Sequence, residues 1–198
     1  MSNVFGDRKI YFEPGTKFSY SGQAFSYLQQ VIESVTTSSY QAFMESAFLP
    51  DIGMRQSSFH FDIDGKPVVL AAASLVSTPS DLSKLFIELV KPRPENRNVA
   101  KLLTEPSVEV IKDLLNWGLG VGIYGCDGDE ALWQWGSNNT PAGTYNSLAV
   151  IYRRRKTGIM LMTSGSKGQS LLKTAVKTAI GGPDFKYWED IPAPIPPQ

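Results

Sequence analysis

The sequence predicts an α+β fold in which a helical region packs on an antiparallel sheet. Three features of the 198-residue chain support this prediction. Apolar residues at helical spacing dominate the first part, β-prone runs joined by short turns follow, and one more helical pattern comes last. Strands joined by short connections pair antiparallel, and helices separated from strands along the chain are typical of α+β proteins.

The helical part begins with two predicted helices. A turn over residues 13–16 comes first, because its Pro and Gly favour a tight bend. Residues 23–35 carry one apolar stripe at helical spacing, which predicts a helix. A second helix is expected over residues 40–47, ending before Leu49-Pro50. Asp64-Gly65, between two β-prone runs, then predicts a hairpin or tight loop.

Two more helices are predicted before the strands. Thr78 to Asp81 forms a capping-box pattern with Pro79 at the first helical position. The helix that it opens ends at Pro92. A polar connector follows, and a short helix is then expected over residues 108–116.

The second part of the chain predicts a strand meander. Its four β-prone runs are residues 121–124, 131–136, 145–152 and 158–163. A last helix is expected over residues 169–180, stopped by Gly181-Gly182. We therefore expect one partial domain over residues 1–182, helical to about residue 116, and a Pro-rich tail over residues 183–198 that is extended and mobile from residue 191.

The composition excludes several function classes. Hydrophobic residues make up 42% of the chain and aromatic residues 11%, which argues against disorder. Lys plus Arg and Asp plus Glu total 19 each, so no basic excess favours nucleic acid as a partner. No apolar run reaches the roughly 18 residues that predict a membrane-spanning helix. The first nine residues lack the apolar core of a signal peptide, so they do not reveal a compartment.

Cysteine and histidine occur once each, as Cys126 and His60. A single Cys forms no internal disulfide, and one Cys with one His cannot build a zinc site from these residues. The lone His also argues against a Ser-His-Asp triad. We expect neither a cofactor nor a bound metal.

Several motifs match by letter but fit their surroundings better as turns. Gly120 to Gly125 spells the G-x-G-x-x-G of dinucleotide sites, yet a turn rather than a helix follows it. Asp62 to Gly65 lacks the closing Glu of a calcium loop. Lys156-Thr157-Gly158 lies in a basic turn between two predicted strands. Asn138-Asn139-Thr140 is a glycosylation sequon only if the chain is secreted by a eukaryote.

Three segments, in this order, resemble one known family. They are Glu13–Gly22 (E-P-G-T-K-F-S-Y-S-G), Ala72–Leu82 (A-A-S-L-V-S-T-P-S-D-L) and Trp133–Asn138 (W-Q-W-G-S-N). They are similar to the P-G-T-x-F-x-Y-S-N, G-G-L-x-S-T-x-x-D-L and H-x-G segments of the serine β-lactamase and D-Ala-D-Ala peptidase-like family, whose esterase-like and class C-like branch fits best. The resemblance implies a β-lactamase/transpeptidase-like fold that is incomplete at its N-terminus.

The resemblance also implies site residues. In the family, a Ser nucleophile in S-x-x-K passes its proton to the Lys and to a Tyr, and Tyr20 matches that Tyr. Gln134 and Gly136 match the strand that binds substrate, and the backbone N–H of Ser137 matches a donor of the oxyanion hole. A phenol needs a nearby ammonium group before it can act as a base near neutral pH.

This chain departs from the family pattern at three points. Gly22 replaces the family Asn, and the neutral Gln134 replaces His or Lys. No S-x-x-K lies among the 19 residues before Tyr20. The matches by letter, Ser164 to Lys167 and Ser170 to Lys173, come at or after the last strand, and the Leu pair of the second is expected to face the core.

Three function hypotheses remain open. The first is a serine hydrolase that transfers an acyl group from a β-lactam, a D-Ala-D-Ala peptide or a small ester, inactive as this isolated chain because the nucleophile segment is absent. The neutral Gln134 favours esters, since the other substrates carry a carboxylate. The second is a non-catalytic, truncated or degenerate family member that acts as a binding module or is a gene fragment. An unpaired sheet edge would favour association with a partner. A dinucleotide-dependent enzyme is the third and rests on Gly120 to Gly125 alone.

Overall fold

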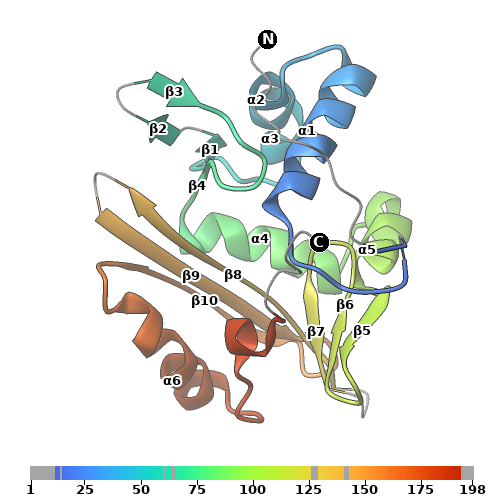
Figure 1. Cartoon of the computed structure of the whole chain (residues 1–198), viewed down its shortest axis with the longest axis vertical. Coiled ribbons are helices and arrows are strands. Elements are labelled where there is room, and N and C mark those ends of the chain that lie inside the picture. The colour runs from blue at the N-terminus through green and yellow to red at the C-terminus, as the bar shows by residue number, and fades with distance from the viewer. Residues whose placement is uncertain are drawn as a thin grey trace.

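The chain forms a six-stranded sheet with helices on both faces and a mainly helical lobe beside it (Figure 1). The computed structural model describes residues 12–13, 15–59, 61–63, 66–125, 129–140 and 143–192. His60, Cys126, the Asp64-Gly65 turn and residues 193–198 of the predicted tail lie outside this part.

The sheet is an antiparallel meander, as the sequence predicts. Its strands, in spatial order, are β5 (Val108–Ile111), β6 (Leu115–Trp117), β7 (Gly122–Tyr124), β8 (Ala131–Thr140), β9 (Gly143–Tyr152) and β10 (Thr157–Ser164). Each strand pairs with its neighbours in the chain. β8 and β9 are the longest strands, with 10 residues each, and register throughout from Ala131 opposite Tyr152 to Thr140 opposite Gly143.

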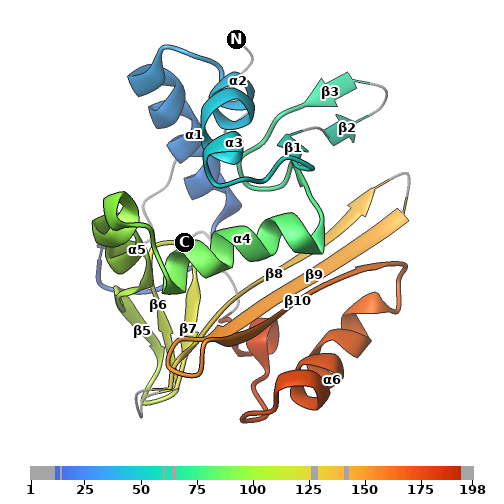
Figure 2. The ribbon, with the colours of Figure 1, turned by 180° about the vertical axis from the view of Figure 1, so that it is seen from behind.

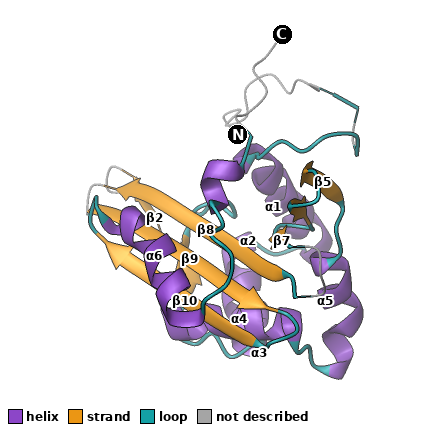
Figure 3. Ribbon diagram, turned by 90° about the horizontal axis from the view of Figure 1, so that it is seen from below, coloured by secondary structure: helices purple, strands orange, loops and turns teal. Residues whose placement is uncertain are grey.

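Alternating side chains of the strands build two separate cores, one on each face of the sheet. On one face, Trp133, Leu148 and Val150 pack against helix α6 (Gly168–Ile180). On the other face, Leu132, Ala149 and Ile151 pack under Phe86 of helix α4 (Pro79–Val90). Figure 3 shows the sheet between these two helices.

The helical lobe lies beyond α4 (Figure 2). It contains α1 (Gly22–Thr36), α2 (Tyr40–Phe43), a π-helical turn η1 (Met44–Phe48), α3 (Leu49–Asp51) and two small hairpins, β1 (Ser58–Phe59) with β4 (Leu75–Val76) and β2 (Phe61–Ile63) with β3 (Lys66–Val68). The remaining short helices are η2 (Pro94–Asn96), α5 (Arg97–Thr104) and η3 (Tyr187–Asp190). Tyr40, Leu49, Met54 and Phe59 form the core of this lobe.

The helix start predicted by the capping pattern at Thr78 is confirmed, with one difference. The Thr78 hydroxyl accepts a hydrogen bond from the Asp81 N–H at 3.2 Å and Pro79 opens α4. The Asp81 carboxylate does not complete the reciprocal bond of a capping box. It accepts instead from the Gln56 N–H at 2.6 Å, the Ser57 hydroxyl at 2.9 Å and the Lys84 ammonium at 2.7 Å. Asp81 thus joins α4 to the segment before β1.

Two predictions about helices are wrong. Residues 108–116 form β5 and part of β6 instead of a helix, because their Val and Ile side chains pair across a turn in which Asp113 adopts a positive φ of 57°. The helix from Tyr40 does not end before Leu49-Pro50 but runs to Asp51. Pro50 lacks the N–H that would form an α-helical hydrogen bond. The wider π-helical turn before it lets the helix continue through this position.

The burial of apolar side chains differs from the sequence predictions at two places near the C-terminus. Leu172 is buried beneath α6 but Leu171 is 62% exposed, so only one of the predicted pair faces the core. Phe185 and Tyr187, in the predicted tail, pack on the sheet, where the Phe185 ring stacks on Tyr124 at 4.1 Å. The packed part of the chain therefore continues past residue 182.

Candidate active site

Tyr20 lies between the start of the helical lobe and the sheet. The residue follows an extended stretch and precedes Ser21, whose hydroxyl caps α1 by accepting from the Ala24 N–H at 3.2 Å. The Tyr20 ring is 5.0 Å from the ring of Trp135 on β8 and 6.4 Å from that of Trp117 on β6. The cap fixes the start of the helix, and the two indoles fix the phenol beside the sheet.

The first helical turn also brings a second family-like segment to this place. A Cβ on Gly22 would lie 3.9 Å from the Ala72 side chain, and the Phe25 ring lies 3.7 Å from the Cβ position of Gly120. The segments around Tyr20, Ala72 and β8, which are far apart in the sequence, therefore meet near the N-terminus of α1.

β8 offers an open edge next to Tyr20. β7 pairs only with Ala131–Trp133, so within the described residues no strand pairs with this side of β8 from Gln134 onwards. The Trp135 N–H points to this side, because it donates to the Gln134 side-chain oxygen at 3.0 Å and not to β9. N–H groups two residues apart on a strand point to the same edge, so the Ser137 N–H faces the open edge too.

The Gln134 side chain is held by the backbone. Its amide nitrogen donates to the Gly120 carbonyl at 3.0 Å, and its oxygen accepts from Trp135. The nitrogen and the oxygen of the amide therefore both bond to backbone groups at the point where the pairing of β7 with β8 ends. The bond to Gly120 uses one of the two N–H groups of this amide.

Ser137 and Gly136 occupy regular strand positions opposite Asn146 and Ser147 of β9. The Ser137 hydroxyl donates to the Asn146 side-chain oxygen at 2.9 Å, and the Asn146 amide donates to the Gly165 carbonyl at 3.3 Å. A Cβ on Gly136 would press on the Ser147 hydroxyl at 2.9 Å. These contacts hold the strand in register and leave the Ser137 backbone N–H directed outwards.

The electrostatics of Tyr20 do not suit a base. Partial burial raises the pKa of the phenol above its ordinary value of 10.0. Within the described part of the chain, no cation lowers it.

The two S-x-x-K matches do not supply the missing ammonium group. Lys173 pairs with Glu189 at 2.6 Å, and the Ser170 hydroxyl donates to the Lys167 carbonyl at 2.8 Å. Ser164 ends β10 and Lys167 caps α6, so this pair lies between two elements that pack on each other.

A family model described as beta-lactamase matches residues 4–180. The chain belongs to the β-lactamase family. A comparison with curated protein sequences found no match.

Solved structures of the β-lactamase fold resemble this chain at low sequence identity. An octameric penicillin-binding protein homologue from Pyrococcus abyssi is 20% identical with a TM-score of 0.69, and the match covers 88% of this chain and 45% of the homologue. A D-stereospecific amidohydrolase from Streptomyces is 18% identical with a TM-score of 0.64, over 87% of this chain and 57% of that enzyme. A D-alanine carboxypeptidase from Burkholderia cenocepacia is 14% identical with a TM-score of 0.65, over 87% and 64%. This chain thus spans about half to two thirds of their lengths.

Other motifs bring no further group to this β-lactamase-family site. Gly120 to Gly125 leads into β7 and the start of its turn, without a helix in the described residues that could meet a pyrophosphate. Of Lys156-Thr157-Gly158, Lys156 lies in the expected turn, and Thr157 and Gly158 begin β10. Among the described residues, no three His, Cys, Asp or Glu side chains lie close enough to hold a metal ion, and no helix is long and apolar enough to cross a membrane.

Sequence reasoning missed the indoles around Tyr20. Trp117 was expected in or beside a helix, and its place on β6 brings it to the site. Trp135 could have been found from strand alternation, since it lies two residues from the buried Trp133 and shares its face.

Proposed function

We propose that this chain is the Tyr-bearing portion of a β-lactamase-family serine hydrolase, and that it needs a Ser-Lys pair from another segment for acyl transfer. The observation that carries the proposal is the position of Tyr20 beside the open edge of β8, with the Ser137 N–H facing that edge. A substrate carbonyl laid along this edge would meet a phenol and a backbone donor together.

The proposed reaction has two halves. The hydroxyl of the supplied Ser attacks the carbonyl carbon, its proton passes to the Lys-Tyr pair, and the leaving group takes a proton as the carbon–heteroatom bond breaks. Water then cleaves the acyl-serine. The Ser137 N–H stabilises the oxyanion in both halves, and an ammonium group near Tyr20 offsets the burial that raises its pKa.

Neutral acyl substrates fit this site best. Relatives of the same fold are called a D-stereospecific amidohydrolase and a D-amino acid amidase. Gln134 offers no positive charge for a substrate carboxylate, and its amide already bonds with Gly120 and Trp135. Small esters and amides without a carboxylate are therefore the proposed substrates.

The non-catalytic alternative has its own support. The raised pKa of Tyr20 describes a phenol that is not a working base, and one N–H of the Gln134 amide is already bonded to the Gly120 carbonyl. In that case the chain would act as a binding module.

A fusion protein separates the two proposals. An N-terminal portion of a β-lactamase-family enzyme that contains an S-x-x-K segment is joined before residue 12, and the fusion is incubated with an activated p-nitrophenyl ester. We expect an acyl adduct by intact mass that is lost in Tyr20→Phe. A folded fusion that acylates equally with Phe at position 20 contradicts a catalytic role for Tyr20.

A further inference from the structure

The segment over residues 181–191, which we call the strap, packs on the same face of the sheet as α6. The family model ends immediately before it. Its two buried rings are Phe185, which stacks on Tyr124 of β7 at 4.1 Å, and Tyr187, whose ring lies 5.2 Å from that of Trp133 on β8. Figure 1 shows the strap in red next to α6.

Polar contacts hold the strap against α6 and β7. The hydroxyl of the buried Tyr124 donates to the Asp190 carboxylate at 2.6 Å. The ion pairs with α6 are Lys173 with Glu189 at 2.6 Å and Lys177 with Asp184 at 3.1 Å. Because surface ion pairs contribute little to stability, the bond from Tyr124 is the main polar contact of the strap.

The backbone of the strap is strained at Tyr187. This residue adopts a positive φ of 55°, which residues with a Cβ rarely adopt. Such a conformation is retained where surrounding contacts fix it. The contacts here are those of the Tyr187 ring with Trp133 and with Tyr124, at 5.2 Å and 5.6 Å. The strap therefore keeps its shape because it is docked on these rings.

One indole connects the strap to the candidate active site. Trp133 is fully buried, and its ring lies 5.6 Å from that of Trp117 and 5.8 Å from that of Trp135. These are the two indoles that contact Tyr20. The Trp133 side-chain N–H has no hydrogen-bond partner among the described residues, so packing alone places this indole. A shift of Trp133 would reach Tyr20 through both of its neighbours.

We propose that the strap positions Tyr20, with Tyr187 and Trp133 as the positioning residues between them. The docked Tyr187 ring keeps Trp117 and Trp135 where they hold the phenol beside β8. Because close-packed rings transmit displacement, release of the strap would move the phenol away from the oxyanion donor. This inference rests on the proposed function and adds to it a segment that controls the geometry of the site.

Fluorine NMR of the full chain with 3-fluorotyrosine at position 20 tests the proposal without a measurement of activity. Tyr187→Gly removes the ring that contacts Trp133, and a positive φ suits Gly. We expect the fluorine resonance to shift toward that of free 3-fluorotyrosine, because the phenol becomes more exposed. An unchanged resonance in the folded variant overturns the proposal.

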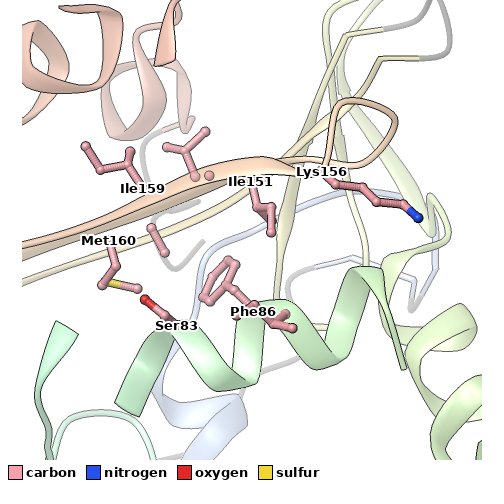
Figure 4. Close-up of a pocket in the computed structure, with 10 residues that line it drawn as sticks. Ser83, Phe86, Ile151, Lys156, Ile159 and Met160 are labelled. Carbon is pink, nitrogen blue, oxygen red and sulfur yellow. The ribbon is translucent and has the colours of Figure 1, made fainter. Parts of the chain in front are cut away.

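A control on the opposite face of the sheet separates positioning from a general loss of stability. Phe86 of α4 packs there, beside the cavity between α4 and β10 that Figure 4 shows. Phe86→Leu should lower the stability of the fold and leave the fluorine resonance unchanged, because Phe86 belongs to the other core. An equal shift in both variants overturns the proposal, since any loss of packing would then move the phenol.

A second pair of variants keeps the test decisive where Tyr187→Gly does not fold. Asp190→Ala removes the acceptor of the buried bond from β7, whereas Asp184→Ala removes only a surface ion pair. Trypsin should cut after the exposed Lys186 at least fivefold faster in Asp190→Ala, with a shift of the fluorine resonance. Asp184→Ala should change neither. Unchanged cleavage of Asp190→Ala, or faster cleavage with an unmoved resonance, overturns the proposal.

The fusion protein described above gives a kinetic readout. In it, Asp190→Ala should lower kcat for the ester at least fivefold and leave KM within twofold, because the phenol is misplaced while the rest of the site is intact. Asp184→Ala should change neither constant. An unchanged kcat in Asp190→Ala overturns the positioning role. A fusion that is inactive without any substitution contradicts the proposed function instead, and the fluorine resonance still decides whether the strap places the phenol.

Discussion

The Tyr20 ring packs at a tilt against the Trp135 ring, and its partial burial raises the pKa of the phenol above 10.0. A group whose pKa is higher in the folded state than in the unfolded state releases its proton first in the unfolded chain. The resulting contribution to stability is complete below pH 10 and is lost as the pH rises through the folded pKa. The phenol is therefore neutral at physiological pH, and its role as a base depends on a cation from elsewhere.

Ultraviolet titration of the phenol tests this state of Tyr20. The difference between the titrations of the native chain and of Tyr20→Phe isolates one of the eight tyrosines. We expect the difference to have its midpoint above pH 10.0, because burial is the cause of the shift. A midpoint below that value would reveal a cation beside the phenol and contradict the account of an incomplete site.

Gly22 and Gln134 differ from the family pattern at two positions that affect substrate specificity. A side chain at position 22 meets only ordinary contact with Ala72, so Asn fits there. In a catalytically complete fusion, Gly22→Asn with Gln134→Lys should raise β-lactam turnover by roughly tenfold or more, since a hydrogen bond to a charged group contributes about 1.5–3 kcal/mol. Steady-state kinetics of a β-lactam and a neutral ester measure the effect. Unchanged β-lactam turnover contradicts the preference for neutral substrates.

Asp81 shows how a carboxylate predicted to cap a helix can serve the tertiary structure. The Lys84 ammonium and bonds from Gln56 and Ser57 hold its pKa below the ordinary value of 3.8. Its contribution to stability is present above that value and is lost as the pH falls through the lower folded pKa.

Urea unfolding of Asp81→Asn tests this role. The variant should be less stable than the native chain at neutral pH, and the difference should shrink at about pH 3 and below as the native carboxyl gains its proton. Asp51→Asn is the control, because its carboxylate forms a surface pair with Arg93 that should contribute little. A difference for Asp81→Asn that is the same at both pH values contradicts the proposed linkage.

At the scale of elements, apolar periodicity predicts most of the fold correctly. The helix over residues 23–35, the helix after Thr78, the last helix and the strand meander are all confirmed. The helix α5 was missed because its Arg, Asn and Lys suggested a connector, although Ala100 and Thr104 are buried at helical spacing. The apolar spacing of residues 108–116 fits both the helical and the strand period, so the sequence alone favours a helix there. Only the pairing of β5 with β6 selects the strand.

α6 offers a matched pair of substitutions. Leu172 is 1% exposed and Leu171 is 62% exposed, although they are adjacent. Leu172→Ala should lower the free energy of unfolding by about 2–5 kcal/mol through the cavity that it leaves. Leu171→Ala should change it by about 0.5 kcal/mol or less. Chemical denaturation measures both, and similar losses would contradict the placement of α6 on the sheet.

At the scale of the whole molecule, the chain matches the β-lactamase family over residues 4–180 and has its fold, with helices packed on an antiparallel sheet. It spans 45% to 64% of the length of the solved relatives described above. Sequence motifs predict a site at Tyr20 and β8, and the structure brings the Tyr20 and Trp135 rings to within 5.0 Å of each other. The family resemblance predicts an unpaired sheet edge, but it does not say which strands form open edges, since that depends on which strands pair across the whole sheet.

The central claim is that this chain has the Tyr and the oxyanion donor of a serine hydrolase but not its nucleophile. Intact-protein mass after incubation with a reactive β-lactam and with an activated p-nitrophenyl ester tests it most directly. The account predicts no covalent adduct on the folded 198-residue chain. A stoichiometric adduct that disappears in Tyr20→Phe would contradict it, because the chain would then contain its own serine nucleophile.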